Sequence, residues 1–273
     1  MIARPFLTSA TNLIKETDMD HKIKALLFPK EHGSWALTFE PLTLALLIAP
    51  SWAGLVLFFG AAFAFFAHPS AKILLASKFK NKMAWLVFLG FGIPAVILLV
   101  LFIRLTGWPI YLPLVLALSL MSLYLLLEAF GLGRKLFTEL MASLAIGLIA
   151  LSLVSAGNFD WNKGLSFLAL LYSRTVMATI YIHYRLLVLK NRLQSVWLHN
   201  VLHGLDFLII AFLWYRHLIP ALGMLAVLIL TIRAIRGVSP GKVKIPVRKL
   251  GFQEVYFGLM FLGLVLLGYW LGI

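Results

Sequence analysis

The chain has 273 residues, of which 62% are hydrophobic and 12% are charged, and it carries a formal net charge of +14. The mean hydropathy of the whole chain is +0.97, and the chain contains several apolar runs of about 20 residues. Both are typical of a polytopic helical membrane protein and exclude a soluble domain of any size. The chain has no cysteine, which excludes disulfides, thiolate metal sites and cysteine nucleophiles. In such a protein the positive charge indicates cytoplasmic loops rather than nucleic-acid binding.

Two regions follow from the pattern of apolar runs. Residues 1–28 are predicted to form a cytoplasmic N-terminal arm, because they mix acidic and basic side chains without a continuous apolar stretch. Residues 29–273 are predicted to form a single transmembrane helical domain. Its apolar windows predict nine spans, near 32–50, 52–75, 83–104, 110–130, 136–156, 165–189, 196–214, 218–236 and 251–272.

The first of these spans is the least regular. Glu40-Pro41 interrupts it, and proline both lacks a backbone donor and disfavours helical geometry in the preceding residue. This span is therefore expected to be kinked, broken or re-entrant.

The basic residues predict the orientation of the spans. If successive loops alternate between the two sides, almost all of the 24 Lys and Arg fall on the side of the N-terminus, as in cytoplasmic loops. An odd number of spans then places the N-terminus inside and the C-terminus outside. The sequence predicts a multi-pass protein of the cytoplasmic (inner) membrane, and five tryptophans form the expected outer aromatic belt: Trp52, Trp108, Trp161, Trp214 and Trp270.

A polar stretch from Pro29 to Trp35, PKEHGSW, precedes the first apolar run. It contains Glu31 and His32 in a chain with only ten Asp and Glu. Charge within the membrane is costly, so both residues are candidates for acid or base catalysis inside the bundle. The alternative is that Glu31 favours a positive helix N-terminus.

Arg174 lies near the middle of its span. An arginine at that depth costs on the order of 3 kcal/mol, so it needs a partner or a ligand. At 100° per residue, Arg174, Tyr181 and Arg185 share one stripe and His183 points away from it. Two arginines and a tyrosine suit a phosphate, diphosphate or carboxylate. The alternative is that Arg174 pairs with an acidic side chain, Glu128, Glu139 or Glu254, for structure alone.

Most other ionisable residues of the spans lie toward the predicted cytoplasmic ends. Such residues usually face the bundle interior, so they predict one polar cavity open to the cytoplasm. The candidate substrate-binding residues are Arg174, Tyr181, Arg185, Arg233, Glu128 and Glu139, and the candidate catalytic residues are Glu31, His32 and Glu254. Gly258 follows Glu254 by one helical turn and permits close helix approach, so Glu254 is also a possible partner of Arg233 or Arg174.

A possible metal pair lies on the seventh predicted span. His199, His203 and Asp206 have i, i+4, i+7 spacing and share a face, and two imidazoles one turn apart can bind a metal. The alternative is that they are hydrogen-bonded polar residues near an interface. No cofactor is specified by the sequence.

The stretch from Pro29 to Trp35 resembles the PKEHGxW signature of the YwiC-like family of bacterial integral membrane proteins. The region from Ser173 to Arg185, the Arg233 region and the segment from Gly251 to Glu254 are similar to that family as well, so the resemblance covers most of the chain from Pro29 onward. It implies a membrane protein and no assigned reaction.

The nine spans and the cytoplasm-facing cavity also resemble the UbiA-type prenyltransferase fold. That resemblance implies a prenylated or anionic lipid substrate. The family's Asp-rich motifs hold magnesium and diphosphate, whereas the matching regions here, 68–82 and 174–192, contain no acidic residue. The resemblance therefore implies a UbiA-like scaffold in which that chemistry is altered or lost.

Three functions follow from these observations. The first is an enzyme or binder acting on a membrane lipid or isoprenoid-type molecule, with arginines holding its anionic group. The second is a metal or haem redox or assembly factor that uses the histidines. The third is a transporter, against which the one-sided distribution of polar residues argues.

Overall fold

The computed structural model describes residues 32–108, 110–133, 135–190, 192, 195–239 and 246–273, and within these ranges it contains nine α-helices and no β-strand. Each predicted span corresponds to one helix, which confirms the all-α prediction. The helices are α2 (His32–Ile48), α3 (Trp52–Ala76), α4 (Lys82–Leu105), α5 (Tyr111–Ala129), α6 (Leu136–Ala156), α7 (Trp161–Leu189), α8 (Trp197–Tyr215), α9 (Ala221–Val238) and α10 (Val247–Leu271).

Eight of these helices, α3 to α10, are long and apolar enough to cross a membrane. The chain is therefore a multi-pass membrane protein. At 17 residues, α2 extends about 25 Å, which is less than the roughly 30 Å of a hydrocarbon core.

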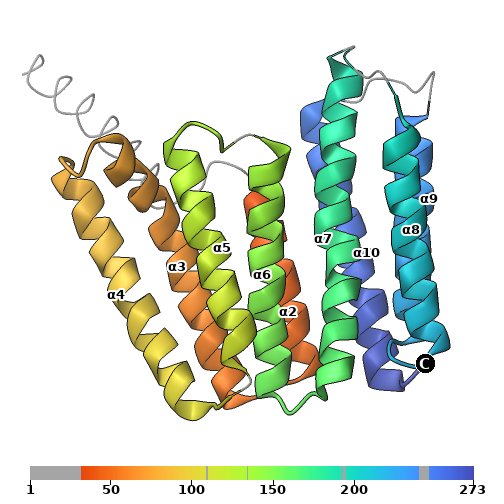
Figure 1. Cartoon of the computed structure of the whole chain (residues 1–273), viewed down its shortest axis with the longest axis horizontal. Coiled ribbons are helices and arrows are strands. Elements are labelled where there is room, and N and C mark those ends of the chain that lie inside the picture. Colours follow the sequence, from red (N-terminus) through yellow and green to blue (C-terminus); the bar gives the residue numbers. More distant parts are fainter. Residues whose placement is uncertain (1–31, 109, 134, 191, 193–194, 240–245) are drawn as a thin grey trace, which may run out of the picture.

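Successive helices run in opposite directions, so the basic loops gather at one end of the bundle (Figure 1). We call this the basic end: α2 begins there, and α3, α5, α7 and α9 finish there. The C-terminus lies at the opposite end. The five belt tryptophans occur where helices meet that opposite end, as predicted from their sequence positions. Which end faces the cytoplasm stays a prediction.

The first helix is not interrupted as the sequence pattern indicated. α2 is one continuous helix that passes through Pro41, so it is not broken there, and it is shorter than each of the eight candidate membrane spans (Figure 1). It packs against α6, α10 and α3, and Leu42, Leu44 and Ala45 are fully buried. Tertiary packing on several sides offsets the backbone hydrogen bond that proline cannot make.

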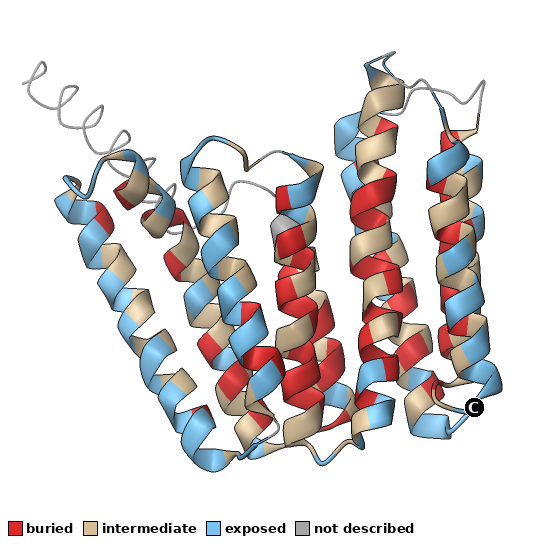
Figure 2. Cartoon of the chain, viewed as in Figure 1, coloured by how far each residue is buried: buried red, intermediate tan, exposed pale blue. Residues whose placement is uncertain are grey.

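The centre of the bundle is formed by α6 and α7, and the periphery includes α4. Figure 2 shows α6 and α7 as largely buried and α4 as largely exposed. The exposed face of α4 consists of aliphatic side chains such as Leu86 and Val96, as expected for a surface that faces lipid. Close approach of α6 to α7 depends on Gly147, because a Cβ there would overlap the ring of Tyr172.

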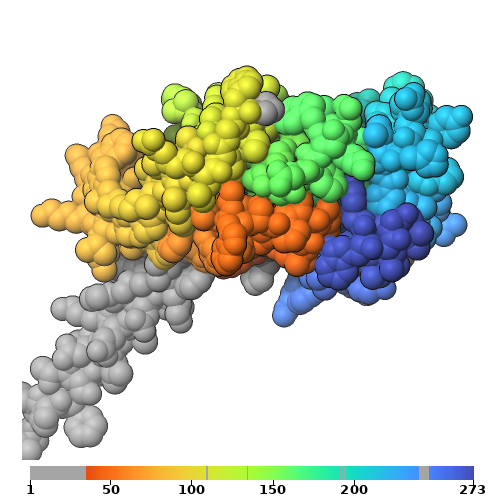
Figure 3. Space-filling model, turned by 90° about the horizontal axis from the view of Figure 1, so that it is seen from below, coloured from red at the N-terminus to blue at the C-terminus, as the bar shows by residue number. Residues whose placement is uncertain are grey.

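The last helix packs against the first described one. α10 lies beside α2, as seen from the end opposite the basic loops (Figure 3). The indole Nε1 of Trp270 donates to the carbonyl oxygen of Leu47 at 3.3 Å. α2 and α10 thus lie side by side, and their carboxylates, Glu40 and Glu254, contact arginines of α7 and α9.

Candidate functional site

Arg174 is at the centre of a buried cluster of charges. Its side chain comes from the middle of α7, and the residue is 4% exposed. Nε donates to Oε1 of Glu40 at 2.9 Å, and Nη2 donates to Oε2 of Glu40 at 3.1 Å. This bidentate geometry is the strongest form of an arginine–carboxylate pair. Of the two alternatives from the sequence, the structure contains the ion pair: Arg174 binds an acidic side chain. Its partner, Glu40, was not among the predicted ones.

Glu254 of α10 extends the cluster. Its Oε2 accepts from Nη1 of Arg174 at 3.4 Å, and its Oε1 accepts from Nη2 of Arg233. Its backbone carbonyl also accepts from Nη2 of Arg174 at 3.0 Å. Glu254 thus contacts both of the arginines that the sequence offered as alternatives. We call Glu40, Arg174, Glu254 and Arg233 the charge cluster; it joins α2, α7, α10 and α9.

Gly258 allows α10 to pack closely against this cluster. A Cβ at that position would lie 2.5 Å from Oε2 of Glu40 and 2.6 Å from Nη2 of Arg174. The predicted role of Gly258 in close helix approach is confirmed, since any side chain there would displace the ion pair.

Arg233 is held between two aromatic rings. Its guanidinium carbon lies 4.4 Å from the centroid of the Tyr181 ring and 4.3 Å from that of Phe257. Cation–π contacts of this kind strengthen as water is excluded, and Arg233 is only partly exposed. Its position is therefore fixed from three sides, by Tyr181 of α7 and by Phe257 and Glu254 of α10.

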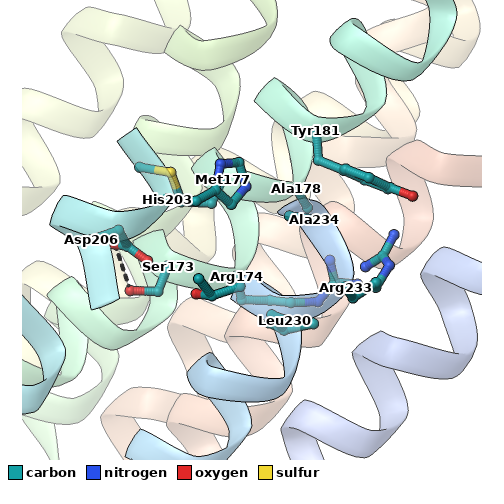
Figure 4. Close-up of a pocket in the computed structure, with 11 residues that line it drawn as sticks. Ser173, Arg174, Met177, Ala178, Tyr181, His203, Asp206, Leu230, Arg233 and Ala234 are labelled. Atoms are coloured by element: carbon teal, nitrogen blue, oxygen red, sulfur yellow. Dashed lines mark hydrogen bonds between the residues drawn. The ribbon is translucent and has the colours of Figure 1, made fainter. Parts of the chain in front are cut away.

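A small pocket lies beside the charge cluster, between α7, α8 and α9 (Figure 4). On its opposite side Asp206 of α8 accepts a hydrogen bond from the hydroxyl of Ser173 at 2.8 Å. The pocket has a volume of about 10 Å³, which is room for about one water molecule. The lining residues are Ser173, Arg174, Met177, Ala178, Tyr181, His203, Asp206, Leu230, Thr231, Arg233 and Ala234.

Arg185 is buried on the predicted stripe with Arg174 and Tyr181, whereas His183 is partly exposed. Nη1 of Arg185 donates to the carbonyl oxygen of Gly237 at 2.6 Å, near the C-terminal end of α9. A cation at a helix C-terminus is favourable. The stripe is thus confirmed, but Arg185 helps to hold α9 against α7 and does not line the pocket.

The two histidines of α8 pack against each other. Their ring centroids are 4.2 Å apart, Nδ1 of His203 donates to the carbonyl oxygen of His199 at 2.9 Å, and Nδ1 of His199 lies 3.1 Å from Oδ1 of Asn200. Within the described part of the chain, no group of three or more His, Asp or Glu is arranged to hold a metal. Among the described residues, His199 and His203 therefore have no third side chain placed to complete the predicted metal site.

Glu128, another predicted site residue, forms its ion pairs outside the charge cluster. Glu128 of α5 accepts from Nζ of Lys72 at 2.5 Å and lies 2.9 Å from Nε2 of His68, both on α3. Glu139 is exposed in the first turn of α6. Glu31 lies outside the described residues, and so does the side chain of His32, where α2 begins. The predicted single cavity therefore contains only part of the expected set.

Because Glu128 forms its ion pairs outside the charge cluster, we expect its replacement to have only a modest effect on stability. Glu128→Gln should lower the free energy of unfolding by about 1 kcal/mol or less, because Lys72 is largely exposed and His68 partly so. Unfolding of the purified protein in a denaturing detergent measures this. A loss of several kcal/mol would instead show that the α3–α5 contact depends on this carboxylate.

Glu40 and Ser173 are two of the site residues that the sequence argument did not identify, as are Phe257 and Thr231. Glu40 was interpreted only through its neighbour Pro41. The cost argument applied to Arg174 also applies to a carboxylate in the middle of an apolar span, and two opposite charges at that depth are natural partners. That signal was present in the sequence.

Comparison with known proteins supports the resemblance noted from the sequence. Residues 28–154 match the model of the YwiC-like protein family. This range includes α2 to α5 and most of α6, whereas the pocket residues of α7, α8 and α9 lie beyond it. No curated protein and no solved structure matches the chain, so the UbiA-like scaffold stays a prediction.

Proposed function

We propose that this YwiC-like multi-pass membrane protein binds a lipid-soluble ligand by its polar headgroup, in the pocket between α7, α8 and α9. The observation that carries the proposal is the lining itself. Asp206 and Arg233 face the same pocket from different helices, yet each is bonded to another residue, Ser173 and Glu254 respectively. Ionisable side chains inside a membrane bundle are expensive and are typical of functional sites.

Both groups retain bonding capacity for a ligand. A carboxylate offers about four lone-pair positions, and Ser173 is the described residue that donates to Asp206. A guanidinium has five N–H donors; Arg233 donates to Glu254 and is also hydrogen-bonded to Tyr181, which leaves further donors for a ligand. The tail of such a ligand can remain in lipid along the apolar outer face of α8, where Leu205, Leu208 and Ile209 are exposed.

The proposal retains the lipid or isoprenoid-type partner expected from the UbiA-like resemblance, together with a location in the cytoplasmic membrane. It changes the residues that hold the ligand. Arg174 contributes to the structure of the site through Glu40 and Glu254, and Arg233 is the arginine placed to contact a headgroup. Acid or base catalysis by Glu254 is not part of this proposal, because both of its carboxylate oxygens accept from arginines.

The test is to identify what copurifies with the protein. Lipids extracted from the protein in mild detergent are measured by mass spectrometry and normalised to protein, for the native chain and for Arg233→Gln. A specific lipid should be retained by the native chain and reduced about tenfold or more in the variant, because a charge-assisted hydrogen bond is lost.

The matched control is Arg236→Gln, on the same helix, where the side chain is exposed. It should retain the lipid at the native level. Equal retention by all three proteins, or no lipid enriched in any of them, would overturn the proposed function.

A further inference from the structure

We infer that the turn between α3 and α4 is a binding site for an anionic phospholipid of the surrounding membrane. The turn lies at the basic end and belongs to helices on the other side of the bundle from α8 and α9 (Figure 1). The inferred site is therefore separate from the pocket of the proposed function. We call it the lysine turn, and it consists of Lys78, Phe79, Lys80, Lys82 and Trp85.

The lysine turn carries positive charge that no described side chain compensates. Its three lysines are exposed, and none of them forms an ion pair within the described part of the chain. Residues 41–127 contain no Asp or Glu, and the next carboxylate along the sequence, that of Glu128, is already paired with Lys72. Each lysine ammonium has three N–H donors, which suit the oxygens of a phosphate group. Lysines beside the membrane attract anionic lipid headgroups, so this turn favours a lipid with net negative charge.

Backbone and side-chain hydrogen bonds hold the turn in one conformation. Lys78 and Phe79 have φ values of 50° and 64°, a left-handed conformation that is uncommon for non-glycine residues. The amide of Phe79 donates to the carbonyl oxygen of Leu74 at 2.7 Å, and Nε1 of Trp85 donates to the carbonyl oxygen of Phe79 at 3.1 Å. Strained backbone of this kind persists where surrounding contacts impose it, and it is common where ligands bind. The turn is thus organised before a lipid arrives.

Two aromatic rings mark the depth of the turn in the membrane. Phe79 and Trp85 are exposed, and their ring centroids are 5.9 Å apart. Tryptophan is enriched at the membrane–water interface, where its ring lies at the level of the headgroups. The lysines of the same turn are therefore placed at headgroup level as well.

The first turns of α4 provide a surface for the acyl chains of the same lipid. Lys82, Leu86, Leu89 and Ile93 have i, i+4, i+7 and i+11 spacing, so they share one face of α4. All four side chains are exposed. An acyl chain that lies along the three aliphatic side chains brings its headgroup to Lys82. This combination of a cationic end and an aliphatic stripe matches a phospholipid better than a free phosphate ion.

The test compares two phospholipids with the same dioleoyl chains, phosphatidylglycerol and phosphatidylcholine. Each is added to the delipidated native chain in mild detergent, and native mass spectrometry gives the apparent dissociation constant of the first bound copy. Phosphatidylglycerol has a net negative charge and phosphatidylcholine has none, so phosphatidylglycerol should bind about tenfold more tightly. A triple variant of the lysine turn, with Lys78→Gln, Lys80→Gln and Lys82→Gln, should lose this preference.

Two controls separate position from total charge and from folding. The first is a triple variant with the same net charge, in which three exposed cations of the opposite end are removed by Arg104→Gln, Lys163→Gln and Arg216→Gln. It should keep the preference for phosphatidylglycerol. Replacing the three lysines of the turn with arginine should also keep it, because the charge remains.

Each contrary outcome overturns the inference. Equal binding of the two lipids to the native chain would do so, as would an equal loss of preference in the two triple glutamine variants. A preference that is lost in Arg233→Gln and kept in the triple glutamine variant of the lysine turn would place the anionic lipid in the pocket between α7, α8 and α9. That last result would support the proposed function while it removed the lysine turn as the site.

Discussion

Replacing Arg174 with methionine is expected to lower the free energy of unfolding by about 3–5 kcal/mol, the cost of breaking a buried ion pair by removing one partner. The variant leaves Glu40 without its described cation and Glu254 with Arg233 alone. Two carboxylates with reduced compensation would then lie between four packed helices. Unfolding of the purified variant in a denaturing detergent, followed by circular dichroism, measures the effect.

The control for this variant is Arg236→Met. Arg236 is exposed on α9, so its removal should change the free energy of unfolding by no more than about 0.5 kcal/mol. If the two methionine variants unfolded at the same denaturant concentration, Arg174 would not be the residue that holds these helices together.

The second large effect is expected at Gly258. In Gly258→Ala the new Cβ would lie 2.5 Å from Oε2 of Glu40 and 2.6 Å from Nη2 of Arg174, so either α10 must move away or the buried side chains of Glu40 and Arg174 must shift. Overpacking of this kind costs about 1–3 kcal/mol. The same unfolding experiment measures it.

Gly263→Ala provides the matched control on the same helix. Nothing lies within 4 Å of a Cβ at Gly263, so this change should be neutral or stabilise α10 by up to about 1 kcal/mol through helix propensity. Equal effects of the two substitutions would contradict the close approach of α10 to the charge cluster.

The helices themselves were predictable from the sequence for a simple physical reason. A membrane-spanning chain must satisfy its backbone within each helix and must present about 20 apolar residues to lipid, so hydropathy alone locates the spans. The predicted span 136–156 coincides with α6, and the predicted start of α7 at residue 165 is four residues late. The difference arises because Asp160 caps α7 and the first turn contains the polar residues Asn162 and Lys163.

The composition of the site was only partly predictable. Helical periodicity placed Arg174, Tyr181 and Arg185 on one buried face, because the positions of residues within one helix follow from local geometry. Local geometry does not determine which helices become neighbours. Glu128 satisfied the same criterion as Glu254, a position near the basic end, yet α5 places it beside α3 and α10 places Glu254 beside α7.

Glu40 shows where local reasoning favoured the wrong feature. Its proximity to Pro41 indicated an interruption, and α2 instead continues through both residues. The buried position of α2 between α6 and α10 supports the helix and at the same time brings the carboxylate to Arg174. Tertiary packing therefore determined both the shape of this segment and the partner of the central arginine.

A double-mutant cycle with Glu40→Gln and Arg174→Met tests the central claim most directly. The claim is that a buried ion pair between α2 and α7 anchors the polar centre of the bundle. It predicts that the two losses in unfolding free energy are not additive, with a coupling of about 2–3 kcal/mol between the residues. Additive losses, with a coupling near zero, would contradict the pairing of these two residues and the structure of the site derived from it.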